Sequence, residues 1–195
     1  MKATELSVDI SDPEEEVVEK AVSLLLSGGV ILYPSDTVYG ILCRADKRDS
    51  VKRLAKIKGY ASQRPFILLV DTTAMVETVA DCSDPEVIGI MGCRWPGKLT
   101  LVLPASEQCP KWVRGEDNTV ALRHPADPLS GQLLKRCGVP LVSTSANYAG
   151  EDSSCSVSAI PHSIIAGVDI VLNAGDLPPS SPSTILSLLR SRGRT

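Results

Sequence analysis

The sequence is poor in aromatic residues and rich in aliphatic ones. Aromatic residues make up 4% of the 195 positions, while hydrophobic residues reach 43%. Aliphatic side chains suit strands that are buried between helices, whereas a surface that stacks nucleic-acid bases needs aromatic rings. The composition therefore favours a folded domain with a buried sheet and disfavours a base-stacking surface.

The sequence also lacks clustered cysteines and histidines that could bind a metal ion. None of the six cysteines forms a C-x-x-C pair, and the two histidines are His124 and His162. A structural zinc site needs four clustered thiol or imidazole ligands, so we expect no metal ligands in this chain. Scattered thiols are typical of small core residues in a reducing compartment, which indicates a cytoplasmic protein. An organelle form stays open, because a cleaved presequence would leave no trace.

Long apolar runs and an excess of positive charge are absent too. No run reaches the roughly 20 residues of a membrane-spanning helix, and residues 1–5 lack the order of a signal peptide. The formal net charge is −3, whereas a protein that mainly grips nucleic acid usually has a basic balance. These absences predict no membrane partner and argue against dedicated polyanion binding, although a local basic cleft is compatible with them.

Helix-like and strand-like segments alternate along the chain. An aspartate followed by proline predicts helix starts at Asp12, Asp84 and Asp127, because aspartate caps free amides and proline suits the first helical position. A further helix is expected around Val51. Short aliphatic runs predict buried strands at residues 30–33, 66–70, 99–103, 119–122, 140–143 and 168–172. This alternation predicts one layered α/β domain over residues 1–195, with about residues 186–195 as a loose tail.

The first polar segment, Tyr33–Gly40, directly follows a strand-like run. Ligands collect at strand ends in α/β sheets, because short hydroxyls and backbone amides are held there on a rigid frame. The hydroxyls of this segment suit a carboxylate or a phosphate. An ordinary turn with a local side-chain hydrogen bond explains the same residues equally well.

The second polar segment, Lys56–Pro65, contains the cations Lys56, Lys58 and Arg64 close to Gly59. Phosphoryl transfer builds negative charge that such cations stabilise. The chain has no P-loop and no paired-glycine dinucleotide signature, so the two commonest nucleotide-binding folds are disfavoured. Taken alone, this segment is explained more simply as a solvated helix end, where Lys56 and Lys58 interact favourably with the helix dipole.

The third polar segment, Ser143–Gly150, again follows a strand-like run and again presents small hydroxyls and an amide. Arg123 lies upstream, at the end of another strand-like run, and Ser183 lies near the end of the chain. Hydroxyl-rich strand ends that recur in this way indicate a single polar cavity lined by Ser, Thr, Asn, Lys and Arg.

Together, these segments resemble the YrdC family of threonylcarbamoyl-AMP synthases. The resemblance runs from about Ala21 to Ile185. Its motifs are Tyr33–Gly40, the Lys58 region, Trp95-Pro96-Gly97 with Leu99–Leu103, Val120–Pro125, Ser143–Asn147 and Pro182–Ile185. The implied fold is a YrdC/RibB-like three-layer α/β (α+β) domain, in which a twisted, mostly buried mixed sheet surrounds a large cationic cavity.

The resemblance also implies roles for individual residues. It assigns threonine binding to Thr37, Arg123, Ser143 and Ser183. It assigns ATP binding to Lys58, Arg64, Thr119, Ser145, Asn147 and Arg192. Arg123 is expected to meet the threonine carboxylate, and Lys58 and Arg64 are expected to be catalytic.

Three positions depart from the family pattern. Ser35 replaces a usual threonine and keeps the hydroxyl, and Lys98 replaces a usual proline. Tyr60 stands where the family has the arginine of a Lys-x-Arg motif. A phenol supplies no fixed positive fork for phosphate, so we expect Arg64 to take over part of that role.

The implied function is that of a nucleotidyltransferase. It would form threonylcarbamoyl-AMP and pyrophosphate from L-threonine, bicarbonate and ATP. A carbamate made from the threonine amine and bicarbonate would attack the α-phosphorus of ATP, and holding the partners together makes this step effectively unimolecular. Mg²⁺ would be carried by ATP, because no acidic cage is evident. The product would pass to a threonylcarbamoyl-transferase complex that modifies tRNA.

Two alternatives stay open. One is a related enzyme that adenylates another carbamoyl donor, such as carbamoyl phosphate. The other is a non-catalytic module that binds double-stranded RNA, tRNA or ribosomes through the same cavity. Pyrophosphate formation with ATP, bicarbonate and threonine favours the synthase, whereas salt-sensitive RNA binding without product favours the module.

Overall fold

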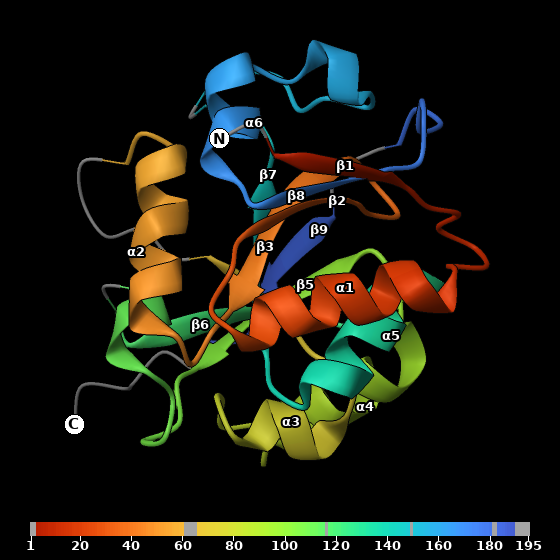
Figure 1. Ribbon diagram of the computed structural model, residues 1–195. Helices are drawn as coiled ribbons and strands as arrows, with labels where there is room; N and C mark the ends of the chain where they lie inside the picture. Colours follow the sequence, from red (N-terminus) through yellow and green to blue (C-terminus); the bar gives the residue numbers. More distant parts are fainter. Residues whose placement is uncertain (1–2, 61–65, 116, 149, 181–182, 190–195) are drawn as a thin grey trace.

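The described residues form a mixed α/β fold around one large mixed sheet. The computed structural model describes residues 3–60, 66–115, 117–148, 150–180 and 183–189. Within these ranges the sheet has nine strands in the order β1-β8-β2-β3-β7-β4-β6-β5-β9 (Figure 1). Parallel pairs such as β4 with β6 and antiparallel pairs such as β3 with β7 occur in the same sheet. The prediction of a layered α/β fold with a mixed sheet is therefore confirmed.

Most strands coincide with the aliphatic runs of the sequence. The strands are β1 (Thr4–Ser7), β2 (Ile31–Pro34), β3 (Tyr39–Arg44), β4 (Ile67–Leu69), β5 (Leu99–Pro104), β6 (Thr119–Arg123), β7 (Leu141–Ser145), β8 (Ile170–Asn173) and β9 (Thr184–Ser187). Side chains in the middle of these runs, such as Leu32, Leu68 and Leu122, are fully buried. Continuous aliphatic runs suit strands that are covered on both faces by other elements.

Helices cover the sheet in two groups. The helices are α1 (Glu15–Leu26), α2 (Arg48–Ile57), α3 (Thr73–Glu77), α4 (Pro85–Arg94), α5 (Pro128–Cys137) and α6 (His162–Gly167). Helices α1 and α5 contact each other, as do α2 and α6, and Figure 1 shows the two pairs in separate parts of the molecule. None of the helices in the described part of the chain has the length and apolar character needed to cross a membrane.

Two of the three expected helix starts are correct. The Asp84 side chain accepts a hydrogen bond from the backbone N–H of Glu86, and the Asp127 side chain accepts one from that of Ser130. The start expected at Asp12 is wrong, because α1 begins at Glu15. The carboxylate of Asp9 accepts the backbone N–H groups of Ser11 and Asp12, so this segment forms a turn before the helix.

Strands β1, β3 and β9 were not expected from the sequence. Strand β3 follows β2 in an antiparallel hairpin, so the polar segment Tyr33–Gly40 is the turn of that hairpin and its flanks. Strand β9 corrects the expected loose tail, because Leu186 and Ser187 pair with Leu101 and Val102 of β5. The remainder of that tail, residues 190–195, lies outside the described residues.

Leu122 offers a direct test of the packing. Its side chain is fully buried at the centre of β6. We expect Leu122→Ala to lower the free energy of unfolding by about 2–5 kcal/mol, because it removes buried methyl groups and leaves a cavity. Ile88→Ala is the control: Ile88 is 53% exposed on α4, so its truncation should change stability by less than about 0.5 kcal/mol. Urea unfolding of both variants measures the difference, and equal costs would contradict the assigned core.

Candidate functional site

One cavity is lined by all four residues that the family resemblance assigns to threonine. It has a volume of about 350 Å³, within the usual range for small-molecule sites. Its lining includes the β2–β3 turn, the end of β6, β7 and the residues around the start of β9. Among the lining residues are Thr37, Arg123, Ser143, Ser145 and Ser183. Residues far apart in the sequence therefore converge on one strand-end cavity.

Sheet register explains this convergence. Ala121 of β6, Ile67 of β4 and Ser143 of β7 are directly paired neighbours. Successive side chains along a strand point to opposite faces, and paired residues share a face. Arg123, Ser143 and Ser145 therefore lie on the same face of the sheet as Ile67. Leu122 and Val142, which directly precede Arg123 and Ser143, point to the other face and are fully buried.

Arg123 is held by a buried ion pair with Asp36. Its Nη2 lies 2.7 Å from both carboxylate oxygens of Asp36, and its Nε donates to the Gly97 carbonyl at 3.2 Å. The side chains are 8% and 14% exposed. Within the described ranges, Nη1 of Arg123 makes no hydrogen bond, so two guanidinium donors stay available. Arg123 is thus fixed at the cavity wall with a free edge that suits a carboxylate.

Each of the three hydroxyl-bearing residues assigned to threonine is hydrogen-bonded to a second hydroxyl. Thr37 Oγ1 lies 3.0 Å from Ser35 Oγ, Ser143 Oγ lies 2.8 Å from Tyr33 Oη, and Ser183 Oγ lies 2.9 Å from Thr100 Oγ1. Burial raises the pKa of the Tyr33 phenol far above its ordinary value. The phenol therefore stays protonated at physiological pH.

Lys58 lies beside two of the residues assigned to ATP, but its ammonium is already occupied. It directly follows α2 and is 2% exposed. Its Nζ donates to the Ser145 carbonyl at 2.6 Å, to the Asn147 carbonyl and to Asn147 Oδ1 at 3.1 Å. An ammonium has three donors, so these acceptors use all of them. Lys58 joins the end of α2 to the end of β7, and contact with a phosphate requires exchange of one acceptor.

The surroundings of Lys58 also change its titration. Burial lowers the pKa of the Lys58 ammonium to about 8, and the nearby Glu151 opposes this shift. The Ser145 hydroxyl donates to Asn147 Oδ1, and the Asn147 amide donates to the Glu151 carbonyl at 2.6 Å. Lys58, Ser145 and Asn147 therefore form one connected polar network at the end of β7.

Tyr60, at the departure from the Lys-x-Arg motif, packs against aromatic and cationic neighbours. Its ring centroid lies 5.9 Å from that of Phe66, a cavity-lining residue, and 6.0 Å from Nζ of Lys58. Arg64, expected to replace the missing arginine, lies outside the described residues.

A change at position 60 tests the departure. We expect Tyr60→Arg to keep or raise the rate of threonine-dependent pyrophosphate release, because it restores a fixed positive fork near the phosphates. Tyr60→Phe is the matched control, because it keeps the ring and should leave the rate close to that of the unchanged protein. A large loss in Tyr60→Arg would mean that this position does not correspond to the arginine of the motif.

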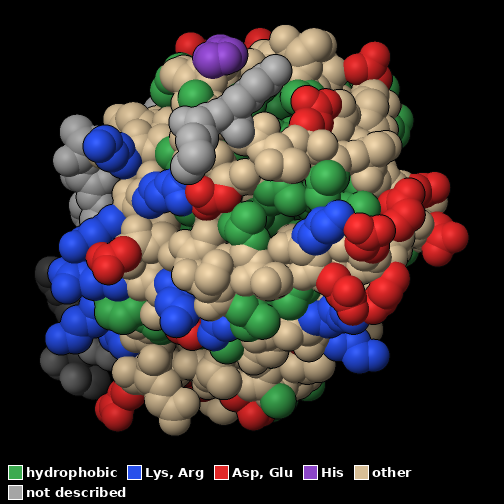
Figure 2. All heavy atoms as spheres, in the orientation of Figure 1, with side chains coloured by type: hydrophobic (Ala, Val, Ile, Leu, Met, Phe, Trp, Pro, Cys, Tyr) green, Lys and Arg blue, Asp and Glu red, His purple; other side chains and the backbone are tan. Residues whose placement is uncertain are grey.

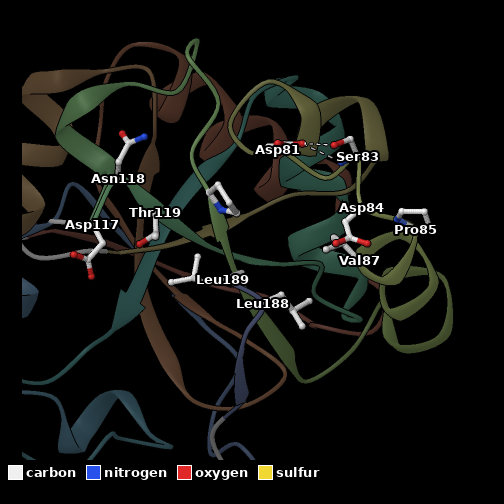
Figure 3. A pocket seen from close by; sticks show the side chains of 11 residues that line it. Asp81, Ser83, Asp84, Pro85, Val87, Asp117, Asn118, Thr119, Leu188 and Leu189 are labelled. Atoms are coloured by element: carbon white, nitrogen blue, oxygen red, sulfur yellow. Dashed lines mark hydrogen bonds between the residues drawn. The ribbon is translucent and has the colours of Figure 1, made fainter. Parts of the chain in front are cut away.

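Thr119 lies at the other end of β6 from Arg123. It lines a separate hollow of about 870 Å³ together with three aspartates, Asp81, Asp84 and Asp117 (Figure 3). Arg123 comes four positions after Thr119 along β6, and four steps along a strand span about 13 Å. Thr119 therefore does not reach the strand-end cavity. Three carboxylates disfavour a triphosphate at this hollow. Arg192, also assigned to ATP, lies outside the described residues.

As lined by the residues that the structure describes, the cavity is smaller and less cationic than expected. Larger hollows of about 870 Å³ and 900 Å³ lie elsewhere, at Asp81–Asp84 and along α4. Among the described lining residues of the strand-end cavity, Arg123 is the one cation and Asp36 balances it. The cations that the sequence suggested are either turned to other partners, as Lys58 is, or lie outside the described ranges, as Arg64 does.

Sequence reasoning assigned no individual roles to three residues of the site: Asp36, Tyr33 and Thr100. Asp36 and Tyr33 are part of the quoted first polar segment, but nothing in the segment shows that Asp36 pairs with Arg123. The available signal was that a buried arginine needs a carboxylate partner. Thr100 is fully buried in β5 and reaches the site through Ser183.

Comparisons with known proteins show the family to which the chain belongs. The sequence model of the Sua5/YciO/YrdC family, described as "Telomere recombination", matches residues 23–195. A threonylcarbamoyl-AMP synthase of Coxiella burnetii is 37% identical to this chain, and the match covers 72% of this chain and 75% of that synthase. A threonylcarbamoyl-AMP synthase of Xanthomonas campestris is 34% identical, and the match covers 87% of this chain and 93% of that synthase.

A solved structure resembles the whole described fold. The crystal structure of P. abyssi Sua5 complexed with L-threonine superposes with a TM-score of 0.87 at 26% identity. The match covers 98% of this chain and 56% of the Sua5 chain. This chain therefore spans little more than half the length of Sua5, and most of the length of the two bacterial relatives.

Proposed function

Because the chain belongs to the Sua5/YciO/YrdC family, we propose that its strand-end cavity binds L-threonine for the formation of threonylcarbamoyl-AMP. Relatives named for this reaction are similar over most of the chain, which supports an enzyme of the nucleotidyltransferase type. The observation that carries the proposal is the meeting of Thr37, Arg123, Ser143 and Ser183 around one cavity. A threonine complex of the related Sua5 supports the choice of amino acid.

In this proposal Arg123 receives the threonine carboxylate. Arg123 uses Nη2 for its bonds to Asp36, so its Nη1 would provide a charge-assisted contact to the carboxylate. The Asp36 pair fixes the guanidinium before substrate arrives, which lowers the entropic cost of binding. The hydroxyls of Thr37, Ser143 and Ser183 would contact the amine and the side-chain hydroxyl of threonine.

ATP would lie next to threonine, with its triphosphate toward the Lys58 network. Ser145 lines the cavity and contacts Asn147, and both belong to the network that Lys58 holds. The aspartates around Thr119 would repel the phosphates of ATP. If ATP extends along β6, Thr119 would therefore contact its uncharged nucleoside end. Arg64 and Arg192 remain predicted ATP contacts.

The reaction itself would proceed in two steps. The threonine amine attacks the carbon of bicarbonate, water leaves, and a carbamate forms. A carbamate oxygen then attacks the α-phosphorus, and pyrophosphate leaves. ATP is the co-substrate, and Mg²⁺ would arrive bound to its phosphate oxygens, which are its preferred ligands. The chain's own residues orient the reactants and exclude water.

The product would then serve tRNA modification. A mixed carbamoyl–phosphate anhydride is labile in water, so it needs a transferase nearby that accepts the threonylcarbamoyl group. We therefore propose a threonylcarbamoyl-transferase complex acting on tRNA as the downstream partner.

Binding of RNA is a second candidate function with its own observation. The exposed side of α2 carries Arg48, Lys52, Arg53 and Lys56, and Figure 2 shows lysines and arginines gathered on this side of the molecule. Such a row suits the phosphate backbone of double-stranded RNA or tRNA. Arg53 is tied to Asp169, which reduces the charge available there.

The experiment that tests the proposed function is detection of the product. The protein is incubated with ATP, Mg²⁺, L-threonine and ¹³C-bicarbonate, and threonylcarbamoyl-AMP is measured by mass spectrometry together with pyrophosphate. We expect both products to require threonine and bicarbonate. Pyrophosphate without threonine dependence would contradict the proposal, and tight, salt-sensitive tRNA binding without product would favour the RNA-binding function.

A further inference from the structure

Strand β9 forms one edge of the sheet, and its outer side is not protected against further pairing. It pairs with β5, and no strand within the described ranges pairs with its other side. Proteins usually protect such an edge with charged side chains or proline. Strand β1, at the opposite edge of the sheet, carries Glu5, whereas residues 183–189 contain neither a charged residue nor a proline. Strand β9 therefore suits pairing with a further strand.

The hydrogen bonds of β9 show which of its backbone groups point outward. The backbone N–H groups of Thr184 and Leu188 donate to carbonyl oxygens on the β5 side, at 3.0 Å and 3.1 Å. Backbone N–H and C=O groups alternate between the two sides of a strand from one residue to the next. The backbone groups of Ile185, Ser187 and Leu189 therefore face away from β5, at the open edge.

Large apolar side chains are exposed on both faces of this edge. Ile185 is 65% exposed, Leu189 is 43% exposed and Leu186 is 37% exposed. Ile185 and Arg123 are both paired with Thr100 of β5, so Ile185 lies on the face of the sheet that carries the strand-end cavity. Leu186 lies on the other face, where it lines the hollow of about 900 Å³ along α4. The open edge thus offers apolar surface together with unpaired backbone groups.

We propose that two copies of the chain pair through β9 in an antiparallel, two-fold arrangement centred on Ser187. This register places Ile185 opposite Leu189 of the partner subunit, and Leu186 opposite Leu188 of the partner subunit. Every exposed apolar side chain of the edge then has an apolar cross-strand neighbour. A register centred on Leu186 would instead place Ile185 opposite a serine. A second copy fits because the edge is self-complementary in this register and its lack of charge brings no like charges together.

The partner subunit would complete the rim of the strand-end cavity, a consequence that rests on the proposed function. Ile185 lines this cavity although its side chain is largely exposed, so an apolar part of the wall is open to water. Leu189 of the partner subunit would lie beside Ile185 on the same face of the sheet and shield it. Exclusion of water protects a reactive intermediate from hydrolysis. We therefore expect the paired form to be the more active one.

Sedimentation equilibrium tests the pairing. One strand pair makes a small interface, so we expect a weak dimer with a Kd in the range of about 1–100 μM. Ser187→Lys places two ammonium groups opposite each other at the two-fold axis and should raise this Kd at least about tenfold. Ser23→Lys, at an exposed serine of α1, is the matched control and should leave the Kd unchanged. A protein that stays monomeric at several times the upper limit of this range, or that associates equally with and without Ser187→Lys, would overturn the proposal.

Cross-linking tests the register without a destabilising charge. Cys93 is the exposed cysteine of the chain, so Cys93→Ser serves as the background. Directly opposed residues of a hydrogen-bonded antiparallel pair have Cα atoms about 5.5 Å apart, within the range of a disulfide. Ser187→Cys in this background should therefore form a covalent dimer on mild oxidation. Leu186→Cys is the matched control and should not, because its thiol faces Leu188 of the partner subunit; equal cross-linking of both variants, or of neither, would overturn the register.

The role of the partner subunit at the cavity is tested by activity at different protein concentrations. Threonine-dependent pyrophosphate release per chain should rise over the same concentrations at which the dimer forms, and Ser187→Lys should shift this rise to higher concentrations by the same factor as its Kd. Constant release per chain across the dimer transition would overturn the role at the cavity. Sedimentation and cross-linking need no activity, so failure of the proposed function is recognised separately from failure of the pairing.

Discussion

Replacing Arg123 with alanine is expected to lower kcat/KM for threonine by at least about a hundredfold, the cost of truncating a buried, hydrogen-bonded charge at a binding site. The threonine carboxylate loses its donors, so the loss should appear mainly in KM for threonine. Arg123→Lys keeps the charge but loses the planar fork, and it should recover part of the activity at most. Steady-state pyrophosphate release with varied threonine measures both variants.

Stability must be separated from binding in this experiment. Removal of Arg123 leaves the Asp36 carboxylate buried and unpaired, which should cost about 3–5 kcal/mol of the free energy of unfolding. Asp36→Asn/Arg123→Gln removes both charges and should regain much of that stability without regaining activity. Arg136→Ala, which breaks an exposed ion pair with Glu15, is the surface control and should change neither quantity appreciably. A folded Arg123→Ala variant with an unchanged KM for threonine would remove Arg123 from the site.

Replacing Lys58 with methionine is expected to lower the catalytic rate by about a hundredfold or more. The variant keeps the length of the side chain and loses the three hydrogen bonds that hold Ser145 and Asn147. A displacement of catalytic groups by about 1 Å can lower the rate of an enzyme by about a hundredfold. Lys56→Met is the matched control, because Lys56 is an exposed lysine two residues earlier on α2. Equal rates in Lys58→Met and the unchanged protein would exclude the network from catalysis.

Lys58 also predicts a dependence of stability on pH. Its pKa in the folded protein, about 8, lies below its ordinary value of 10.5. Between these values the unfolded chain binds more protons, so the contribution of Lys58 to the free energy of unfolding rises as the pH increases from about 8 to 10.5. Urea unfolding across this range should therefore show a rise in the unchanged protein relative to Lys58→Met. Parallel curves for the two proteins would mean that Lys58 titrates normally.

Local sequence signals predicted those parts of the fold that depend on neighbouring residues. Asp84-Pro85 and Asp127-Pro128 begin helices because cap and first-turn preferences act within a few residues. The start at Asp12 failed because the carboxylate of Asp9 accepts the backbone N–H groups of Ser11 and Asp12, which holds Asp12 in a turn before the helix. Strand β9 was missed because its residues are all exposed and its place depends on pairing with β5, far away in the sequence.

The candidate site was predictable in its membership and much less in its contacts. Hydroxyls at strand ends indicated one cavity, and Thr37, Arg123, Ser143, Ser145 and Ser183 do line one. The partners of Lys58 were not predictable, because two of them are backbone carbonyls that any residue type supplies. The distance between Thr119 and Arg123 follows from the straight course of β6, which the motif alone does not specify.

The most direct test of the account is a crystal structure of the protein with L-threonine bound. The account predicts density for the amino acid between the β2–β3 turn and β7, with its carboxylate on Arg123 and its other polar atoms among the hydroxyls of Thr37, Ser143 and Ser183. Threonine bound at another hollow, or bound in this cavity with its carboxylate away from Arg123, would contradict it.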